Sequence, residues 1–188
     1  MHLDGSCHCG KVRFSVEAYA PLPFMRCHCS ICRKTAGGGG FAINLGGWKK
    51  TLKVKGEKHL SVYRAQGGGR EAPGKKSSLR RHFCKHCGSA LWCYDPTWPD
   101  LVHPHASAID TPLPPAPAHD DIMLAYKAPW EPLPPRRKGD RRFAEYPDLS
   151  LADWHEKMGW KEGKRVVKAK RTPAKKAATR KRSGKAAA

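Results

Sequence analysis

Seven of the eight cysteines of this chain fall into three short groups, and these groups constrain the fold more than any other feature. Groups this tight are typical of metal ligands or reactive thiols in a reducing compartment, although an even cysteine count leaves a disulfide framework as the alternative. The groups are a C-x-C pair (Cys7 and Cys9), a C-x-C-x-x-C triplet (Cys27, Cys29 and Cys32) and a C-x-x-C-G pair (Cys84 and Cys87). The eighth cysteine, Cys93, stands alone.

The first and last groups together supply the four ligands of a closed zinc site. Two cysteines three residues apart, followed by Gly88, form a knuckle whose tight turn aims backbone N–H groups at the sulfurs. In an extended C-x-C segment Cys7 and Cys9 point to one side and His8 points away, which gives a second two-ligand unit. Among divisions that split no group, only two plus two closes a tetrahedral site, so the predicted structural zinc ligands are Cys7, Cys9, Cys84 and Cys87.

The middle group then offers three thiolates to a second zinc ion whose fourth position is open. Three protein ligands plus water or substrate is the arrangement of catalytic zinc, so Cys27, Cys29 and Cys32 are predicted to be catalytic as well as metal-binding. Two alternatives stay open. A fourth protein ligand could complete this site and make both zinc sites inert, or Cys29 and Cys32 could act as a redox pair. Candidate fourth ligands are His28, His82, His86 and Cys93, although a lone cysteine in a strand is usually a small buried hydrophobe.

The segments between and after the cysteine groups predict a mainly β fold. Alternating or apolar runs of five to nine residues recur between Gly, Pro and Lys-rich turns, which is typical of short strands. Six such strands are expected, at residues 11–18, 41–45, 51–55, 60–64, 90–94 and 101–109.

One helix is expected close to the C-terminal end of this β region, at 150–160. Ser150 is a suitable N-cap, and Leu151, Trp154 and Met158 follow at helical spacing. Among the connections, we expect glycine-rich 67–78 to be a mobile loop. The proline-rich stretches are expected to wrap the domain or to act as linkers, at 111–118 and 131–140.

Charge divides the chain near residue 160. The whole sequence has a net charge of +20, from 36 Lys and Arg against 16 Asp and Glu. Residues 161–188 hold 12 of these basic residues with one acid and no aromatic residue, so we predict a disordered tail after a zinc-binding domain at 1–160. Such a tail either solubilises the protein or attracts nucleic-acid phosphates without sequence preference.

The N-terminal segment and the apolar runs indicate a cytoplasmic protein. MHLDGSCHCG lacks the basic and apolar regions of a signal peptide, and no run approaches the ~18 apolar residues of a membrane span. We therefore expect no membrane association, and association with nucleic acid only through the tail.

Several segments resemble the glutathione-dependent formaldehyde-activating enzyme family, which includes centromere protein V. They are GSCHCGKVRF, CHCSICRKTAGGGGF, RHFCKHCGSAL and the closing YPDLSLADWHEKMGW, which together span most of residues 3–160. The resemblance implies a β-tent fold, two zinc sites and an activity of the carbon–sulfur lyase type, as in the joining of glutathione to formaldehyde as S-hydroxymethylglutathione. It also implies the same division of ligands, with Cys27, Cys29 and Cys32 catalytic and the other four cysteines structural.

An open zinc site of three thiolates favours a substrate thiol plus a small carbonyl compound. The thiolates outweigh the charge of the ion, which weakens its Lewis acidity and makes a zinc-held substrate thiolate more nucleophilic. Glutathione carries two carboxylates, and the basic residues beside the ligand groups either pair with them or form a solvated face: Arg26, Arg33, Lys34, Arg80 and Arg81. The alternative to an enzyme is a non-catalytic zinc module that binds nucleic acid through its basic loop and tail.

Overall fold

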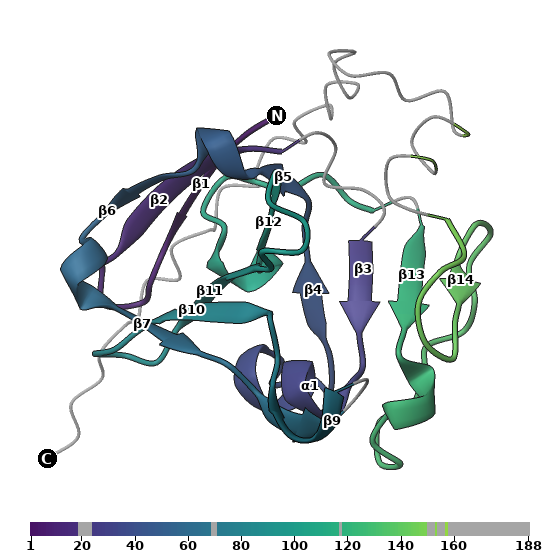
Figure 1. The fold of residues 1–188 in the computed structure, drawn as a ribbon. Helices are drawn as coiled ribbons and strands as arrows, with labels where there is room; N and C mark the ends of the chain where they lie inside the picture. The colour runs from purple at the N-terminus through teal and green to yellow at the C-terminus, as the bar shows by residue number, and fades with distance from the viewer. Residues whose placement is uncertain (19–23, 69–70, 117, 150–152, 154–156, 158–188) are drawn as a thin grey trace, which may run out of the picture.

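The computed structural model describes residues 1–18, 24–68, 71–116, 118–149, 153 and 157. Over these residues the fold is mainly β, as predicted, with one α-helix and three antiparallel or mixed sheets plus a separate hairpin. Figure 1 shows the sheets as separate groups of strands, with the helix α1 below strand β4.

The first sheet has the order β1–β2–β6 and is antiparallel throughout. Its strands are β1 (His2–Ser6), β2 (Arg13–Glu17) and β6 (Lys53–Lys55). Leu3, Phe14 and Val16 are buried on one face, as the alternating pattern requires. The strands β1 and β2 approach so closely that a Cβ at Gly5 would lie 2.4 Å from the Phe14 ring. The turn between these two strands carries the first cysteine pair.

The second sheet contributes most of the remaining core and has the order β5–β12–β11–β10–β7. Leu91, Trp92 and Val102 are buried in the same cluster as the first sheet, and the Phe14 and Trp92 rings meet edge-on with centroids 5.1 Å apart. Its strands are β5 (Gly47–Trp48), β7 (Leu60–Tyr63), β10 (Arg80–Cys84), β11 (Ala90–Tyr94) and β12 (Leu101–Pro104).

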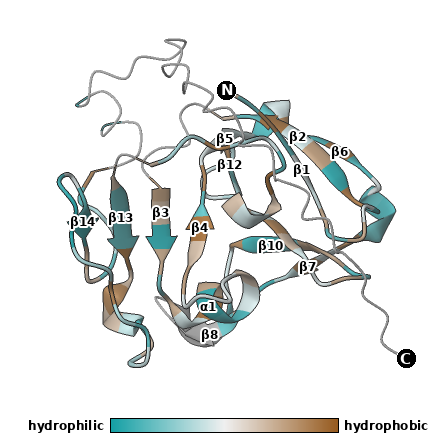
Figure 2. Cartoon of the chain, turned by 180° about the vertical axis from the view of Figure 1, so that it is seen from behind, coloured by the Kyte–Doolittle hydropathy of each residue, from teal (hydrophilic) through white to brown (hydrophobic). Residues whose placement is uncertain are grey.

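The third sheet has the order β14–β13–β3–β4 and is unusually polar. Its strands are β3 (Phe24–Cys27), β4 (Ala42–Asn44), β13 (His119–Ile122) and β14 (Arg141–Arg142), and β13 runs parallel to both β3 and β14. Figure 2 shows β13 and β14 in the colour of hydrophilic residues. Asp120 and Asp121 on β13 are buried, and arginines on both neighbouring strands pair with them.

The only α-helix among the described residues outside 150–160, α1 (Ser30–Ala36), was not predicted. A helix of seven residues is too short to show a clear apolar period in the sequence. In the described part of the chain, four 3-10 helices connect strands: η1 (Lys49–Thr51), η2 (Glu57–His59), η3 (Ala106–Ala108) and η4 (Leu124–Tyr126). The helix η3 falls in the second half of the strand predicted at 101–109, which therefore ends at Pro104.

The prediction that residues 67–78 form a loop is wrong, and their mobility stays a prediction. This segment contains most of a β-hairpin of β8 (Gln66–Gly68) and β9 (Glu71–Lys76). Backbone pairing builds it, and Ser77 N donates to Ala65 O at 2.8 Å where the hairpin closes. Glycine-rich composition indicates a turn but does not exclude a ladder made by backbone groups alone.

All six predicted strand regions contain a strand, at β2, β4, β6, β7, β11 and β12. The proline-rich segments have no helix or strand where they are described. The helix predicted at 150–160 lies outside the described residues except for Asp153 and Lys157, which are helical, and the tail at 161–188 lies wholly outside them. In the part of the chain that is described, no helix is long and apolar enough to cross a membrane.

Candidate metal centres

Four sulfurs from two distant parts of the chain meet at the first centre. Cys7 and Cys9 come from the β1–β2 turn, and Cys84 and Cys87 come from the end of β10 and the turn after it. All four Sγ atoms lie within 4.8 Å of one another, with 3.6 Å between those of Cys7 and Cys9 and 3.8 Å between those of Cys9 and Cys84. Zinc–sulfur bonds of about 2.3 Å in a tetrahedron place ligand sulfurs about 3.8 Å apart. The donors of this four-cysteine centre and their spacing therefore fit zinc.

Both halves of the four-cysteine centre are built on glycine-terminated turns. Gly88 has a φ of 72° and its N–H bonds to Cys84 O at 2.9 Å, as the predicted knuckle requires. Gly10 has a φ of 71° and bonds to Cys7 O in the same way, so the expectation of an extended C-x-C segment at Cys7 and Cys9 is wrong. Like the knuckle, this turn directs a backbone N–H group at a sulfur, because Val12 N–H donates to Cys7 Sγ at 3.2 Å.

The second centre joins the end of β3 to the first turn of α1. Cys27 is the last residue of β3, Cys29 is the N-cap of α1 and Cys32 lies one turn later. Their three sulfurs lie within 4.8 Å of one another. Cys29 Sγ accepts from Cys32 N at 3.3 Å, and hydrogen bonds from the Cys27 and Cys32 side chains lower the pKa of Cys29 well below its ordinary value. This three-cysteine centre offers three soft donors to the same kind of ion.

None of the candidate fourth ligands joins the three-cysteine centre, and no other described His, Cys, Asp or Glu does. The His82 ring stacks on Trp92 at 5.1 Å, and exposed His86 contacts His59 at 2.9 Å beside the other centre. Cys93 is buried on β11, where burial raises the pKa of its thiol to about 12. These positions favour three protein ligands over four.

The side chain of His28 is buried and contacts carboxylates rather than the cysteines that flank it. Its Nε2 lies 3.0 Å from Asp121 Oδ1, and its Nδ1 lies 3.0 Å from Glu131 Oε1. Arg26 also holds Asp121, through Nε at 2.7 Å and Nη2 at 3.0 Å. The Glu131 carboxylate packs against the backbone of Gly40, where a Cβ would lie 2.4 Å from Glu131 Cδ. A cluster of buried charges thus fixes the chain beside the three-cysteine centre.

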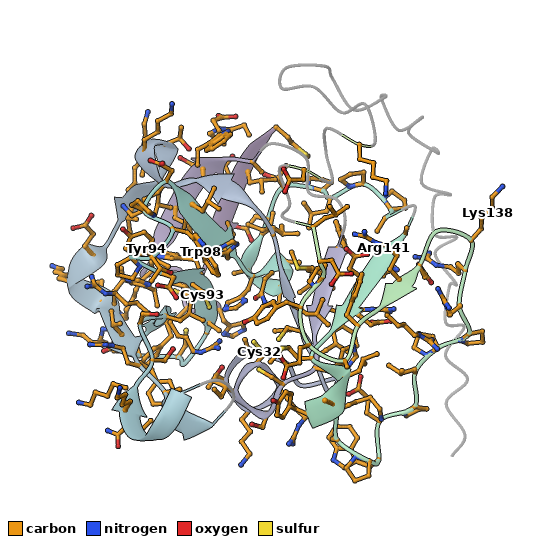
Figure 3. The ribbon with its side chains drawn as sticks, turned by 45° about the vertical axis from the view of Figure 1, so that its right-hand side comes forward. Cys32, Cys93, Tyr94, Trp98, Lys138 and Arg141 are labelled. Atoms are coloured by element: carbon orange, nitrogen blue, oxygen red, sulfur yellow. The ribbon has the colours of Figure 1, made fainter. Side chains whose placement is uncertain are left out.

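Arg81 approaches the three-cysteine centre from the second sheet. Its Nη1 lies 3.6 Å from Cys32 Sγ and 3.6 Å from Cys93 Sγ. Figure 3 shows Cys32 and Cys93 in the interior of the ribbon, on different elements. Arg81 is 7% exposed, whereas its neighbour Arg80 on the same strand is exposed to solvent. The sequence places both arginines near the ligands, and only Arg81 contacts one.

Comparison with known proteins assigns the chain to a family. A family model described as "Glutathione-dependent formaldehyde-activating enzyme" matches residues 2–124. The chain belongs to this family. A relative from Halomonas elongata, named "Putative glutathione-dependent formaldehyde-activating enzyme", is 55% identical over 163 residues, which cover 87% of this chain and 100% of the relative. A crystal structure of a Rhodobacter sphaeroides protein aligns with a TM-score of 0.46 at 23% identity, over 76% of this chain and 99% of that one.

The range matched by the family contains all seven grouped cysteines together with His28, Arg81 and Asp121. Glu131, which also contacts His28, lies beyond that range. No motif indicates either carboxylate, because both lie roughly a hundred residues from His28 and are joined to it only by sheet pairing and packing.

An open cavity of about 700 Å³ lies beside α1, against the four-cysteine centre. Arg33 and Lys34 line it, with Gly37, Gly38 and Asp110, but none of the sulfurs of the three-cysteine centre does. Arg33 also lies over the Trp130 ring, with 6.0 Å from Cζ to the centroid, and its Nε is buried without a hydrogen-bond partner. Of the predicted substrate cations, Arg33 and Lys34 thus face a cavity, and Arg26 is held by Asp121.

Proposed function

We propose that this family member is a zinc-dependent enzyme of the carbon–sulfur lyase type, with a β-tent fold, one structural zinc site and one open catalytic zinc site. The observation that carries the proposal is the three-cysteine centre, whose sulfurs gain no fourth protein ligand in the described part of the chain. The name of the Halomonas elongata relative supports glutathione and formaldehyde as substrates. The sulfurs of the four-cysteine centre are proposed to hold the structural ion.

The reaction adds a thiol to a carbonyl group. The glutathione sulfur bonds to the formaldehyde carbon, the carbon–oxygen double bond becomes a single bond, and the thiol proton ends on that oxygen. Zinc bound by the three cysteines would supply an open position for the substrate sulfur.

The protein's own residues fix the geometry of this site. Cys27 and Cys32 are buried, so water reaches the centre chiefly on the side of Cys29. His28 anchors the segment between Cys27 and Cys29 through two buried carboxylates, which holds the sulfurs in place while substrate enters and leaves.

Arg33 and Lys34 are proposed to bind the substrate carboxylates, since both line the cavity beside α1 and Arg33 follows Cys32 directly in the chain. A guanidinium and an ammonium group suit two carboxylates at different positions. Arg26 is proposed to act indirectly, because its guanidinium is paired with Asp121, which in turn contacts His28.

The test is the rate of adduct formation, because thiols and formaldehyde also combine without a catalyst. Exchange NMR with ¹³C-formaldehyde and glutathione measures that rate at equilibrium. The zinc-loaded wild-type protein is expected to increase the exchange rate, and Cys29→Ser, which removes the most accessible ligand of the triplet, is expected to give the uncatalysed rate. Equal rates with wild-type protein, with Cys29→Ser and without protein contradict the proposal.

A further inference from the structure

Strand β10 connects the two metal centres. Cys84 at its end belongs to the four-cysteine centre, and Arg81, three residues earlier, has its Nη1 3.6 Å from Cys32 Sγ of the three-cysteine centre. Neighbouring strands hold Arg81 on both sides, because it pairs in register with Tyr63 on β7 and with Cys93 on β11. The position of this guanidinium is therefore set by an inner strand of a sheet rather than by a surface loop.

The side chain of Arg81 faces sulfur atoms rather than carboxylates in the part of the chain that the structure describes. Its Nη1 contacts the sulfurs of Cys32 and Cys93. A buried cation is costly unless a negative group accompanies it. Burial keeps Cys93 as a neutral thiol by raising its pKa, so the negative groups that Arg81 faces are those of the three-cysteine centre.

His105, which contacts Cys93, is neutral as well. His105 is 2% exposed, its Nε2 lies 3.6 Å from Cys93 Sγ, and burial lowers its pKa to about 4. It is therefore neutral at physiological pH. The positive charge of Arg81 is thus directed at the three cysteines, with neutral groups on its other side.

This placement matters for the fourth ligand. Three thiolates and a divalent ion carry a net negative charge, so a further thiolate from the substrate adds charge of the same sign. A cation held beside one ligand sulfur offsets part of that repulsion, whereas a neutral fourth ligand has no need of it.

We infer that Arg81 is a positioning residue that compensates the charge of the three-cysteine centre and so makes an anionic thiolate, rather than a neutral ligand, the preferred fourth partner. This inference rests on the proposed function, and it names the charge of the substrate atom that the open site selects. Arg81 acts through Cys32 and need not touch the substrate.

The experiment compares two probes on the full chain loaded with cobalt in place of zinc. 2-Mercaptoethanol binds as a thiolate and imidazole binds as a neutral nitrogen ligand, and both change the cobalt absorption spectrum. Arg81→Met removes the charge, Arg81→Gln keeps an N–H donor without charge, and Arg81→Lys keeps the charge. Arg80→Met is the matched control, because Arg80 is exposed on the same strand.

We expect Arg81→Met and Arg81→Gln to bind 2-mercaptoethanol about tenfold more weakly than wild type, because the positive charge that offsets the negative centre is lost. The affinity for imidazole should change less than about twofold. Arg81→Lys should recover most of the thiol affinity, and Arg80→Met should match wild type. Thermal unfolding of each cobalt-loaded variant is recorded alongside, so that a folding defect is separated from a change in ligand preference.

Equal weakening of both probes in Arg81→Gln, or no weakening of either, overturns the inference. A wild-type protein whose spectrum does not respond to 2-mercaptoethanol overturns the proposed function instead. If Arg81→Met fails to fold, the comparison of Arg81→Gln with Arg81→Lys still decides between charge compensation and a purely structural role.

Discussion

His28 lies between two cysteines of the three-cysteine centre in the sequence, yet its ring contacts two buried carboxylates and does not join that centre. Its direction follows from the local pattern, since the middle residue of a C-x-C segment at the end of a strand points away from its neighbours. The partners of the His28 ring cannot be predicted from the local sequence, because Asp121 is 93 residues away and becomes adjacent only through the parallel pairing of β13 with β3. Residue types and spacing thus predicted the two cysteine clusters but not the groups that support them.

Replacing His28 is expected to destabilise the fold. His28→Leu leaves Asp121 and Glu131 buried without the ring between them, so we expect the free energy of unfolding to fall by about 3 kcal/mol. Urea unfolding of the zinc-loaded protein measures the change. His59→Ala is the control, because His59 contacts His86 at the surface and its loss should change the free energy of unfolding far less. Similar losses in the two variants contradict the assigned role of His28.

The elements of the fold were predictable where an apolar period or a glycine turn marked them. Strands such as β2 and β11 alternate or carry β-forming residues, and Gly88 marks the knuckle after β10. The helix α1 and the polar strand β13 have no such signal, and the glycines at 67–69 indicate a turn but not the strands β8 and β9. In β13 two aspartates are buried because arginines on adjacent strands pair with them, and that arrangement exists only after the sheet has formed.

The proline-rich segment at 131–140 is held to the third sheet by Asp140. Its carboxylate accepts from His119 N at 2.8 Å and Arg137 N at 2.9 Å. Burial opposes the charge, but these backbone bonds and the Arg137 side chain lower the pKa of Asp140 to about 2. Asp140 therefore stabilises the folded state in its ionised form.

Removing this acceptor should give a stability loss that depends on pH. Asp140→Asn is expected to lower the free energy of unfolding by about 1–3 kcal/mol at pH 7. A carboxylate with a depressed pKa stabilises the fold fully above its unfolded pKa of about 4 and loses that effect as pH falls through its folded pKa. The difference between wild type and Asp140→Asn should therefore shrink between about pH 4 and pH 2, in unfolding curves recorded across that range. A difference that is constant with pH contradicts this account.

The two cysteine centres differ in how much chain they join. The four-cysteine centre ties the β1–β2 turn to the end of β10, whereas the three-cysteine centre spans only the end of β3 and one turn of α1. A metal ion bound at the first centre would therefore contribute its binding energy to folding. Cys84→Ser is expected to lower the thermal midpoint by about 10 °C or more, and Cys29→Ser by much less. Equal losses of folded protein in circular dichroism contradict the division into structural and catalytic sites.

At the scale of the whole molecule, a large share of the positive charge lies in residues 161–188, outside the described residues. Residues 161–188 carry 12 of the 36 basic residues, and whether they bind nucleic acid or only solubilise the domain stays a prediction from composition. The family match ends before this segment, at residue 124.

Removal of residues 161–188 should weaken binding to generic duplex DNA and leave the zinc domain folded. Each phosphate neutralised by the tail contributes about −0.9 to the slope of log K against log salt concentration, so truncation should flatten that slope. Fluorescence anisotropy with a labelled duplex at several salt concentrations measures it. Full-length protein without DNA affinity at low salt leaves the tail as a solubilising segment.

The central claim is that the molecule holds two zinc ions, one in a closed site and one in an open site that accepts a substrate thiol. Native mass spectrometry of the full chain, before and after addition of glutathione, counts the ions and the bound ligand in one measurement. We predict two zinc ions in the wild-type protein, one bound glutathione per chain, and one zinc ion without glutathione in Cys29→Ser. A wild-type protein with two zinc ions that binds no glutathione, or a Cys29→Ser variant that binds it equally well, contradicts the claim.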